Sequence, residues 1–240
     1  QTIQKLNDLK DYKYLVAWTD TLNKKNKGRS IIFCGEHSSD GDLNYKKQKN
    51  YKIPSIFGFF FMNLICLKFF NLFYYLFHKN NQIMKKDINN FFYPLDIVNN
   101  WNKLYGKNGF TQIQLLIKQN KNSKDLLLEI INFFSEKGFY SYLTTLKEYG
   151  EGNENLLSFG EKGLSITLDF ALNNDFLKVY KEFEIKFNNK DIKVYLAKDS
   201  FMSQTFFKNT YSKLNNFIEL QKKVNPNSTF KSKLSQRLGL

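Results

Sequence analysis

The chain has 240 residues, of which 42% are hydrophobic and 17% aromatic, and it carries a formal net charge of +14. This apolar content excludes a globally disordered chain, and the length allows one large domain or two small ones. The charge comes from lysines spread through every segment, with arginine only at positions 29 and 237, whereas nucleic-acid recognition favours clustered arginine. We therefore predict no nucleic-acid partner.

The two cysteines, Cys34 and Cys66, show no metal-ligand spacing and do not indicate a disulfide framework. They fit a reducing compartment, so we predict a cytoplasmic protein without a bound metal. The sequence begins at Gln1 without an initiator methionine or a signal peptide. We therefore expect it to be the C-terminal part of a longer protein.

In the first hundred residues, aromatic and β-branched content predicts strands over 12–20 and 29–34, which would form an antiparallel pair. The most apolar run covers 53–77, but Lys68, Asn63 and Asn71 interrupt it. A charged side chain at mid-bilayer is costly, which favours a buried or interfacial helix over one that spans a membrane. A core helix and a helix that faces lipid at the inner membrane both remain open. A short helix is expected over 96–104.

From residue 110 onward the hydrophobic period alternates between the strand and helix types. The predicted elements are a strand over 110–117, a helix over 123–136 with Ser123 as its N-cap, strands over 140–149 and 164–170, a helix over 173–189 and a strand over 191–196. This order predicts an α+β fold with an antiparallel sheet flanked by helices, of the ferredoxin-like type. A last helix over 210–224 and a tail over 225–240 complete the chain.

Polar residues on these strands are the candidates for chemistry. Residues two apart on a strand share a face, so the members of this set would meet on one surface if the strands form one sheet: Gln112, Gln114, Lys147, Ser165, Thr167, Asp169, Tyr195 and Lys198. Other interpretations stay open from the pattern alone. The glutamines could be satisfied at the edge of the core, Lys147 could face solvent, and Lys198 could be an ion-pair partner of a nearby aspartate.

Several motifs, in order along the chain, resemble those of the FAD-linked oxidases of the vanillyl-alcohol-oxidase superfamily. They are AWTD at 17–20, GRS at 28–30, YPLDIVNNWNKLYGKNGFTQIQ at 93–114, LKEYG at 146–150, LSF at 157–159, LDF at 168–170, YLAKDS at 195–200 and VNPNSTFKSKLSQRLGL at 224–240. The resemblance is to the C-terminal substrate domain of the members that oxidise decaprenylphosphoryl ribose, and more distantly to aldonolactone oxidases. It implies that residues 1–240 form a substrate domain and that an N-terminal domain, absent from this sequence, holds most of the FAD. The chain alone is then expected to be inactive.

The resemblance also implies roles for individual residues. Lys198 matches the catalytic lysine beside flavin and substrate, while Tyr195 and Gln114 match residues next to the cofactor. The remaining matches line the substrate pocket: Trp18, Gln112, Gln114, Lys147, Ser165 and Thr167. Ser165 stands where the family pattern has an asparagine, and Thr167 stands where it has a cysteine. Because Thr167 carries no thiol, inhibitors that need that cysteine are not expected to attach covalently.

The implied reaction is oxidation of a sugar secondary alcohol, in particular the 2-hydroxyl of a polyprenylphosphoryl pentose, to a keto sugar. A short-chain reductase partner would complete an epimerisation, and the apolar run at 53–77 would make peripheral contact with the membrane. An aldonolactone or other sugar oxidase of the same superfamily is the first alternative. A non-catalytic membrane-associated module is the second.

Overall fold

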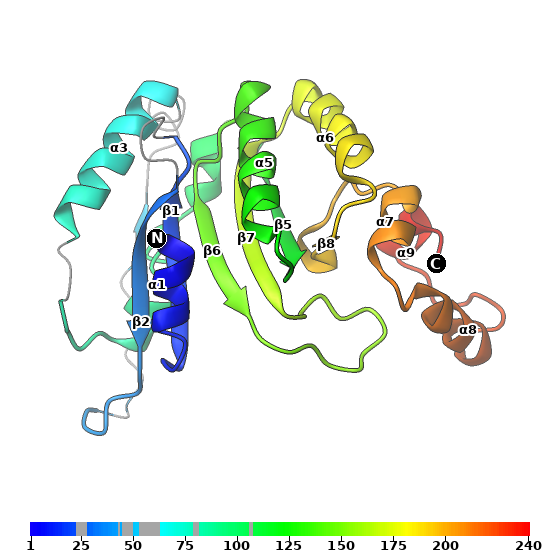
Figure 1. The fold of residues 1–240 in the computed structure, drawn as a ribbon, viewed down its shortest axis with the longest axis horizontal. Helices are drawn as coiled ribbons and strands as arrows, with labels where there is room; N and C mark the ends of the chain where they lie inside the picture. The colour runs from blue at the N-terminus through cyan, green and yellow to red at the C-terminus, as the bar shows by residue number, and fades with distance from the viewer. Residues whose placement is uncertain (23–27, 43, 45–49, 53–62, 79–81, 106–107) are drawn as a thin grey trace. The chain divides into compact units, whose positions relative to one another are not determined.

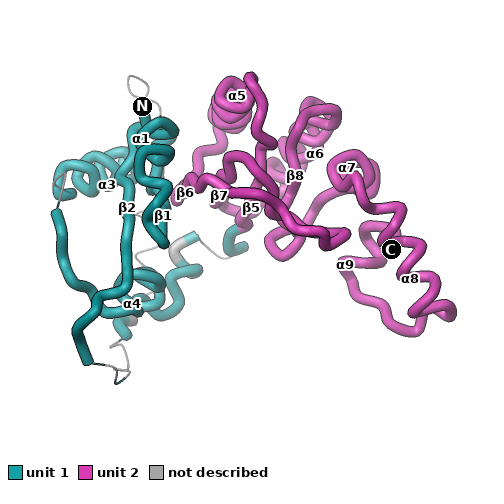
Figure 2. Tube along the Cα trace, turned by 60° about the horizontal axis from the view of Figure 1, so that its bottom comes forward, with its two compact units in different colours: residues 1–110 teal, residues 111–240 magenta. Residues whose placement is uncertain are grey.

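A computed structural model describes residues 1–22, 28–42, 44, 50–52, 63–78, 82–105 and 108–240. The chain divides into two compact units, Gln1–Phe110 and Thr111–Leu240, which are coloured separately in Figure 2. Each unit has its own secondary structure and is described by itself. The first ten residues of the apolar run, 53–62, lie outside the described residues.

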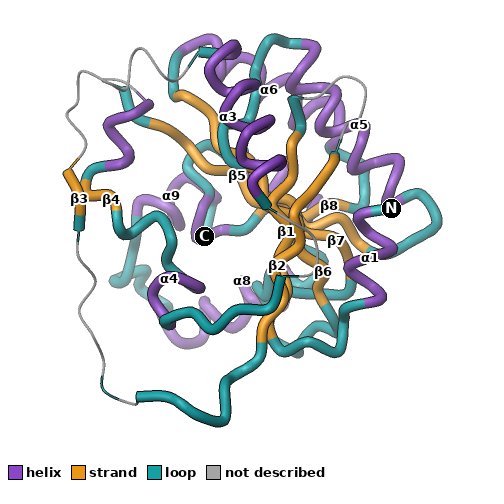
Figure 3. The backbone as a smooth tube through the Cα atoms, turned by 90° about the vertical axis from the view of Figure 1, so that its left-hand side faces the viewer, coloured by secondary structure: helices purple, strands orange, loops and turns teal. Residues whose placement is uncertain are grey.

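The first unit contains the predicted strand pair. Its elements are α1 (Thr2–Asp8), β1 (Tyr14–Asp20), β2 (Arg29–Gly35), β3 (Tyr51–Lys52), α3 (Leu64–Phe77), α4 (Ile88–Phe92), β4 (Val98–Asn99) and the 3₁₀ helix η1 (Trp101–Tyr105). Strands β1 and β2 are antiparallel, which confirms the prediction. Strands β3 and β4 form a short parallel pair (Figure 3). The helix expected over 96–104 is wrong in its first half, because Val98 and Asn99 extend to pair with β3.

The polar residues that interrupt the apolar run explain where α3 begins and how it docks. Asn63 is the N-cap and accepts a hydrogen bond from the N–H of Cys66. Asn71 is buried and donates to Asp20 Oδ1 at 2.9 Å. Leu67 is the other buried residue of the helix, and most of the other apolar side chains of α3 are exposed among the described residues. Among the described residues, no helix is long and apolar enough to cross a membrane.

The second unit carries the predicted alternation of strands and helices (Figure 1). Its elements are β5 (Phe110–Lys118), α5 (Ser123–Glu136), β6 (Thr144–Tyr149), β7 (Gly163–Ala171), α6 (Asn174–Phe187), β8 (Ile192–Val194), the 3₁₀ helix η2 (Leu196–Lys198), α7 (Gln204–Thr210), α8 (Leu214–Val224) and α9 (Lys233–Leu238). The strands run in the order β6-β7-β5-β8, and β6–β7 and β5–β8 are antiparallel. This order is that of a ferredoxin-like unit, and the α+β prediction is confirmed.

The core of the second unit lies between its sheet and the helices α5 and α6. Phe170 of β7 contacts Phe134 of α5 with ring centroids 4.8 Å apart and Phe176 of α6 at 5.1 Å. Because strand side chains alternate, Ile166 and Leu168 lie on the same face of β7 as Phe170. Ser165, Thr167 and Asp169 point to the other face. One face of β7 therefore builds the core, and the other is left for polar groups.

Three boundaries differ from the prediction. Asn122, not Ser123, precedes α5, and the Ser123 hydroxyl instead donates to the Lys118 carbonyl at 2.8 Å. The helix expected over 210–224 begins only at Leu214, as α8, while a separate helix, α7, ends at Thr210. Between them Tyr211 turns inward, and its hydroxyl donates to the Val194 carbonyl at 2.6 Å. The tail contains α9, which begins at Lys233 with a capping box at Ser232.

Candidate functional site

The polar residues of β5, β6 and β7 lie on the sheet face opposite α5 and α6, here called the polar face. In the β6–β7 register, Lys147 is opposite Ser165 and Thr145 is opposite Thr167. Residues opposite each other in an antiparallel pair project on the same side of the sheet. The register therefore brings Lys147 to the face that carries Ser165, Thr167 and Asp169.

The two glutamines of β5 reach across to β7 on this face. Gln112 Nε2 donates to Asp169 Oδ1 at 2.6 Å, and Gln114 Nε2 donates to Ser165 Oγ at 3.1 Å. Gln114, Ser165 and Asp169 are 5%, 1% and 0% exposed, so these polar groups are satisfied inside the protein rather than by bulk water. The two amides, which the sequence places on one face of the strand, thus form a hydrogen-bond network between β5 and β7.

Lys198 lies at the end of η2, four residues after the end of β8, and two charges of the polar face influence its pKa. Burial lowers the pKa of Lys198 below its ordinary value; the Asp169 carboxylate acts in the opposite direction, and Lys147 lowers the pKa further. Lys147 itself is exposed, as the solvent-facing interpretation held, yet its charge reaches Lys198. The pKa of Lys198 thus responds to one buried carboxylate and one exposed ammonium of the polar face.

Asp199 is not the partner of Lys198. Asp199 Oδ2 lies 2.6 Å from Arg237 Nη2 of α9, and its Oδ1 accepts hydrogen bonds from the N–H groups of Phe201 and Met202 at 3.0 and 2.8 Å. With that carboxylate occupied by Arg237, Asp169 is the carboxylate that raises the pKa of Lys198. The C-terminal helix thus fixes the residue that follows the candidate lysine.

An aromatic cluster borders the polar face and includes two residues that the sequence interpretation did not select. The ring of Phe159 contacts Tyr195 at 4.8 Å and Tyr149 at 5.8 Å between centroids. The Tyr149 hydroxyl lies 3.4 Å from Gln114 Nε2. The Tyr195 N–H donates to the Gln114 carbonyl at 2.9 Å. For Tyr149, the signal in the sequence was its position two residues after Lys147 on the same strand; Phe159 lies in a loop and had none beyond the LSF motif.

Trp18 belongs to the first unit. It is buried, stands opposite Ile31 in the β1–β2 register, and packs edge-on against Tyr74 of α3 at 4.9 Å between ring centroids. The residues expected at one site are therefore divided between the units. Those of the second unit are together on the polar face, and the role of Trp18 stays a prediction.

The chemistry of the polar face suits a polyhydroxylated ligand that carries or develops negative charge. Amide and hydroxyl groups provide donors and acceptors at fixed spacing, and an aromatic ring provides a surface for stacking. A partly buried ammonium stabilises an anion more strongly than one in water, because the local dielectric constant is lower.

No protein-family model matches the sequence. Comparison with curated proteins finds 28% identity over 242 aligned residues to the decaprenylphosphoryl-beta-D-ribose oxidase of Mycolicibacterium smegmatis, covering 96% of this chain and 52% of that protein. A second relative, described as an uncharacterized protein in the mprA 5'region of Streptomyces coelicolor, is 29% identical over 118 residues, which are 49% of this chain and 32% of that protein. The chain thus spans about half the length of the first relative and a smaller part of the second.

The alignment to the oxidase takes in nearly the whole chain and therefore extends over both units. The resemblance inferred from the motifs is confirmed by this comparison. The chain is therefore similar, along almost its entire length, to about half of a decaprenylphosphoryl-beta-D-ribose oxidase.

Proposed function

We propose that this chain is the substrate domain of an FAD-dependent oxidoreductase that converts a secondary alcohol of a sugar into a ketone. The observation that carries the proposal is the cross-strand network of the two β5 glutamines, to which the Tyr195 N–H, three residues before the half-buried Lys198, is hydrogen-bonded. The similarity to decaprenylphosphoryl-β-D-ribose oxidase supports an oxidase of that kind. Within that class, the proposed substrate is a polyprenylphosphoryl pentose, oxidised at its 2-hydroxyl.

The residues of the polar face fit the reactive ring of FAD better than its phosphates. Tyr195 and Lys198 are three residues apart, at the two ends of the η2 turn, and provide an aromatic ring and a half-buried lysine. This combination suits a flat heterocycle that gains negative charge. When bound, FAD supplies the acceptor for the hydride removed from the sugar carbon. Tyr195, Lys198 and Gln114 are the proposed contacts, while a domain beyond this chain would hold the rest of the cofactor.

The remaining polar residues would bind and orient the sugar. Gln112 and Gln114 are held by Asp169 and Ser165, so their amides are fixed before the substrate arrives. Lys147 is exposed on the same face and would meet the substrate phosphate or a hydroxyl. Ser165 and Thr167 would shape the pocket floor, and Trp18 is proposed as a further wall. The Lys198 ammonium would orient the reacting hydroxyl.

The test of catalysis uses protein expressed from the complete coding sequence, with Lys198→Ala and a matched Lys178→Ala variant. Lys178 is an exposed lysine of α6, paired with Asp175. We expect Lys198→Ala to keep its flavin but to lose reduction of that flavin by substrate, while Lys178→Ala behaves like the parent protein. Normal flavin reduction in Lys198→Ala would remove the lysine from the mechanism.

An aldonolactone or other sugar oxidase is the alternative within the same chemistry. Flavin reduction by polyprenylphosphoryl ribose and by soluble aldonolactones in one assay separates the two, since the proposal requires preference for the phosphorylated lipid-linked sugar. The keto product would be consumed by a short-chain reductase, and that partner is proposed on chemical grounds, because epimerisation needs the ketone to be reduced on the opposite face.

Peripheral contact with a membrane is a second element of the proposal, and the surface of α3 favours it. Phe69, Phe73 and Phe77 recur at a spacing of four residues and are 57%, 52% and 78% exposed, so they form a stripe on one side of the helix. Lysines precede the run at 46, 47, 49 and 52 and follow it at 79, 85 and 86. An apolar stripe with basic flanks suits the surface of a bilayer that contains anionic lipids.

Liposome flotation tests this contact with Phe69→Ser/Phe73→Ser and with Ile185→Ser as the control, since Ile185 is an 80% exposed apolar residue on α6. We expect the double variant to lose most of its bilayer-bound fraction and the control to keep it. Equal binding by all three proteins would contradict a lipid-facing α3. Complete release by salt alone would assign the attraction to the lysines rather than to the phenylalanines.

A further inference from the structure

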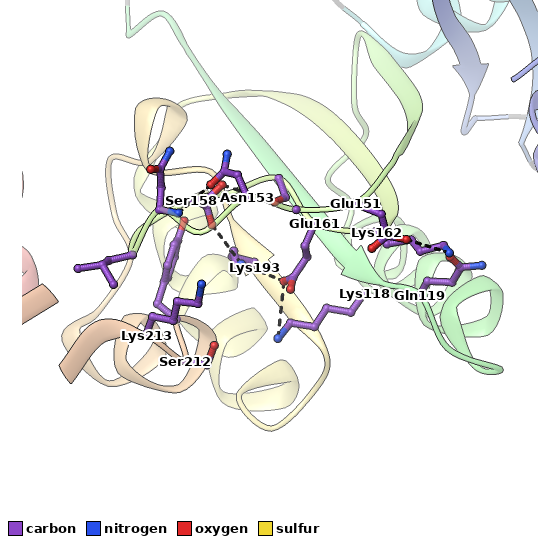
Figure 4. A pocket seen from close by; sticks show the side chains of 15 residues that line it. Lys118, Gln119, Glu151, Asn153, Ser158, Glu161, Lys162, Lys193, Ser212 and Lys213 are labelled. Carbon is purple, nitrogen blue, oxygen red and sulfur yellow. Dashed lines mark hydrogen bonds and ion pairs between the residues drawn. The ribbon is translucent and has the colours of Figure 1, made fainter. Parts of the chain in front are cut away.

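A cavity of about 610 Å³ lies in the second unit, and none of its lining residues is among the proposed contacts of FAD or the sugar. It is formed by the end of β5 at Lys118, by the loop between β6 and β7, by Lys193 of β8 and by the segment between α7 and α8 (Figure 4). Its volume is in the range of small-molecule sites, about 300–1,000 Å³. We call it the lysine cavity.

The lining carries more positive than negative charge. Four lysines, at 118, 162, 193 and 213, face two glutamates, at 151 and 161. Glu161 Oε1 is shared, lying 2.9 Å from Lys193 Nζ and 3.6 Å from Lys118 Nζ. Lys213 Nζ donates to the Glu154 carbonyl at 3.4 Å rather than to a carboxylate. Two positive charges are thus left for a ligand to balance.

Lys193 is the buried lysine of this group, and its side chain is held in a defined position in the wall of the cavity. The residue is 7% exposed, its ammonium donates to the Ser158 carbonyl at 3.1 Å, and it lies 5.4 Å from the ring centroid of Tyr211. A lysine is seldom buried to this extent unless its charge is paired. Figure 4 shows the side chains of Lys193 and Lys118 converging on Glu161, so one carboxylate serves two ammonium groups.

The start of α8 adds to the positive potential. Ser212 and Lys213 line the cavity and directly precede this helix of 11 residues. The N-terminal end of a helix carries a partial positive charge and free N–H groups, which favour an anion. Apart from Leu156 and Tyr211 the lining residues are polar or glycine, so the cavity suits a soluble ligand rather than a lipid chain.

We propose that the lysine cavity binds a soluble phosphate-bearing anion at a site that includes none of the proposed FAD or sugar contacts. A phosphate dianion would balance the two excess positive charges and accept hydrogen bonds from the ammonium groups of Lys118 and Lys213. The ion pair of Lys193 with Glu161 would stay in place as a fixed wall of the cavity. The same wall positions the Ser158 carbonyl, which is next to Phe159 of the aromatic cluster. This inference does not depend on the proposed oxidase activity.

The probe is inorganic phosphate, titrated into the 240-residue chain by calorimetry against chloride at equal ionic strength. We expect saturable binding that weakens about tenfold in Lys213→Ala and further in Lys118→Ala/Lys213→Ala, because each removes a charge-assisted hydrogen bond. Lys178→Ala on α6 is the control and should bind as the parent chain does. Lys147→Ala is measured as well, because Lys147 is the other proposed phosphate contact. Circular dichroism melting verifies that every variant is folded.

Two results would overturn the proposal. The first is heat from phosphate that does not exceed that from chloride, which would mean that the charges are only screened. The second is loss of phosphate binding in Lys147→Ala with retention in Lys118→Ala/Lys213→Ala, which would move the anion to the polar face. Neither result bears on flavin reduction in Lys198→Ala, so the two proposals fail independently.

Discussion

Removal of Arg237 should destabilise the second unit and disturb the turn that carries Lys198. The guanidinium lies 2.6 Å from Asp199 Oδ2, and it also donates to the Met202 carbonyl at 2.5 Å. The Asp199 side chain is 1% exposed and that of Arg237 is 29% exposed. Arg237→Leu therefore leaves a buried carboxylate without its cation and a carbonyl without its donor.

The expected cost follows from the burial of that carboxylate. Breaking a buried ion pair by removing one partner costs about 3–5 kcal/mol. The N–H groups of Phe201 and Met202 still solvate Asp199, and Arg237 is partly hydrated, so we expect the lower end, about 3 kcal/mol. For a chain of this size each kcal/mol corresponds to about 2–4 °C, which gives a fall in melting temperature of about 6–12 °C.

Thermal and urea unfolding followed by circular dichroism would measure this loss. Lys178→Ala, which breaks an ion pair between side chains that are 75% and 77% exposed, is the control and should change stability by less than about 0.5 kcal/mol. Arg237→Lys should fall between them, because it keeps the charge but not the forked donor. A loss below about 1 kcal/mol in Arg237→Leu would refute the argument, since it would mean that Asp199 does not need its cation.

Three further predictions concern the polar face and the core. Because the positive charge of Lys147 lowers the pKa of Lys198, Lys147→Gln should move the alkaline limb of the pH profile of flavin reduction to higher pH; a limb that stays or moves down would contradict this. Burial raises the pKa of Glu184 above 4.5, so its contribution to stability falls as pH rises through the folded-state pKa. Glu184→Gln should therefore raise the melting temperature near about pH 7 but not near about pH 4, and an equal gain at both would be inconsistent with a proton-linked cause. A Cβ on Gly163 would lie 2.2 Å from the Ile117 carbonyl oxygen, so Gly163→Ala should cost about 1–3 kcal/mol in urea unfolding, and full stability would count against this close approach.

The sequence was most informative where a long periodic pattern coincided with local chemistry. The helix over 123–136 matches α5, because its apolar positions recur at helical spacing and Gly138 ends it with a φ of 80°. The order of strands and helices then implies a ferredoxin-like sheet, and the two-residue period places both glutamines of β5 on the face of Ser165. These features need no knowledge of distant contacts.

Features that depend on tertiary contacts could not be predicted from the hydrophobic pattern of the sequence. The break between α7 and α8 occurs where Tyr211 is buried and bonds the Val194 carbonyl, and no helix-breaking residue marks that point. Phe159 reaches the aromatic cluster from a loop, where side-chain direction follows no period. The lysine cavity depends on bringing Lys118, Lys193 and Lys213 together from distant segments, which spacing alone cannot show.

The turn that carries Lys198, η2, is attached to β5 by the hydrogen bond from the Tyr195 N–H to the Gln114 carbonyl. The exchange rate of that amide hydrogen would therefore report opening of the turn. Because β8 ends at Val194, this amide is the first beyond the strand, and the Lys198 N–H in turn bonds the Tyr195 carbonyl at 3.0 Å. Hydrogen exchange at these two amides would report local opening of the turn separately from unfolding of the sheet. A ligand that orders the turn would slow both exchange rates while amides in the middle of β7 remain unchanged.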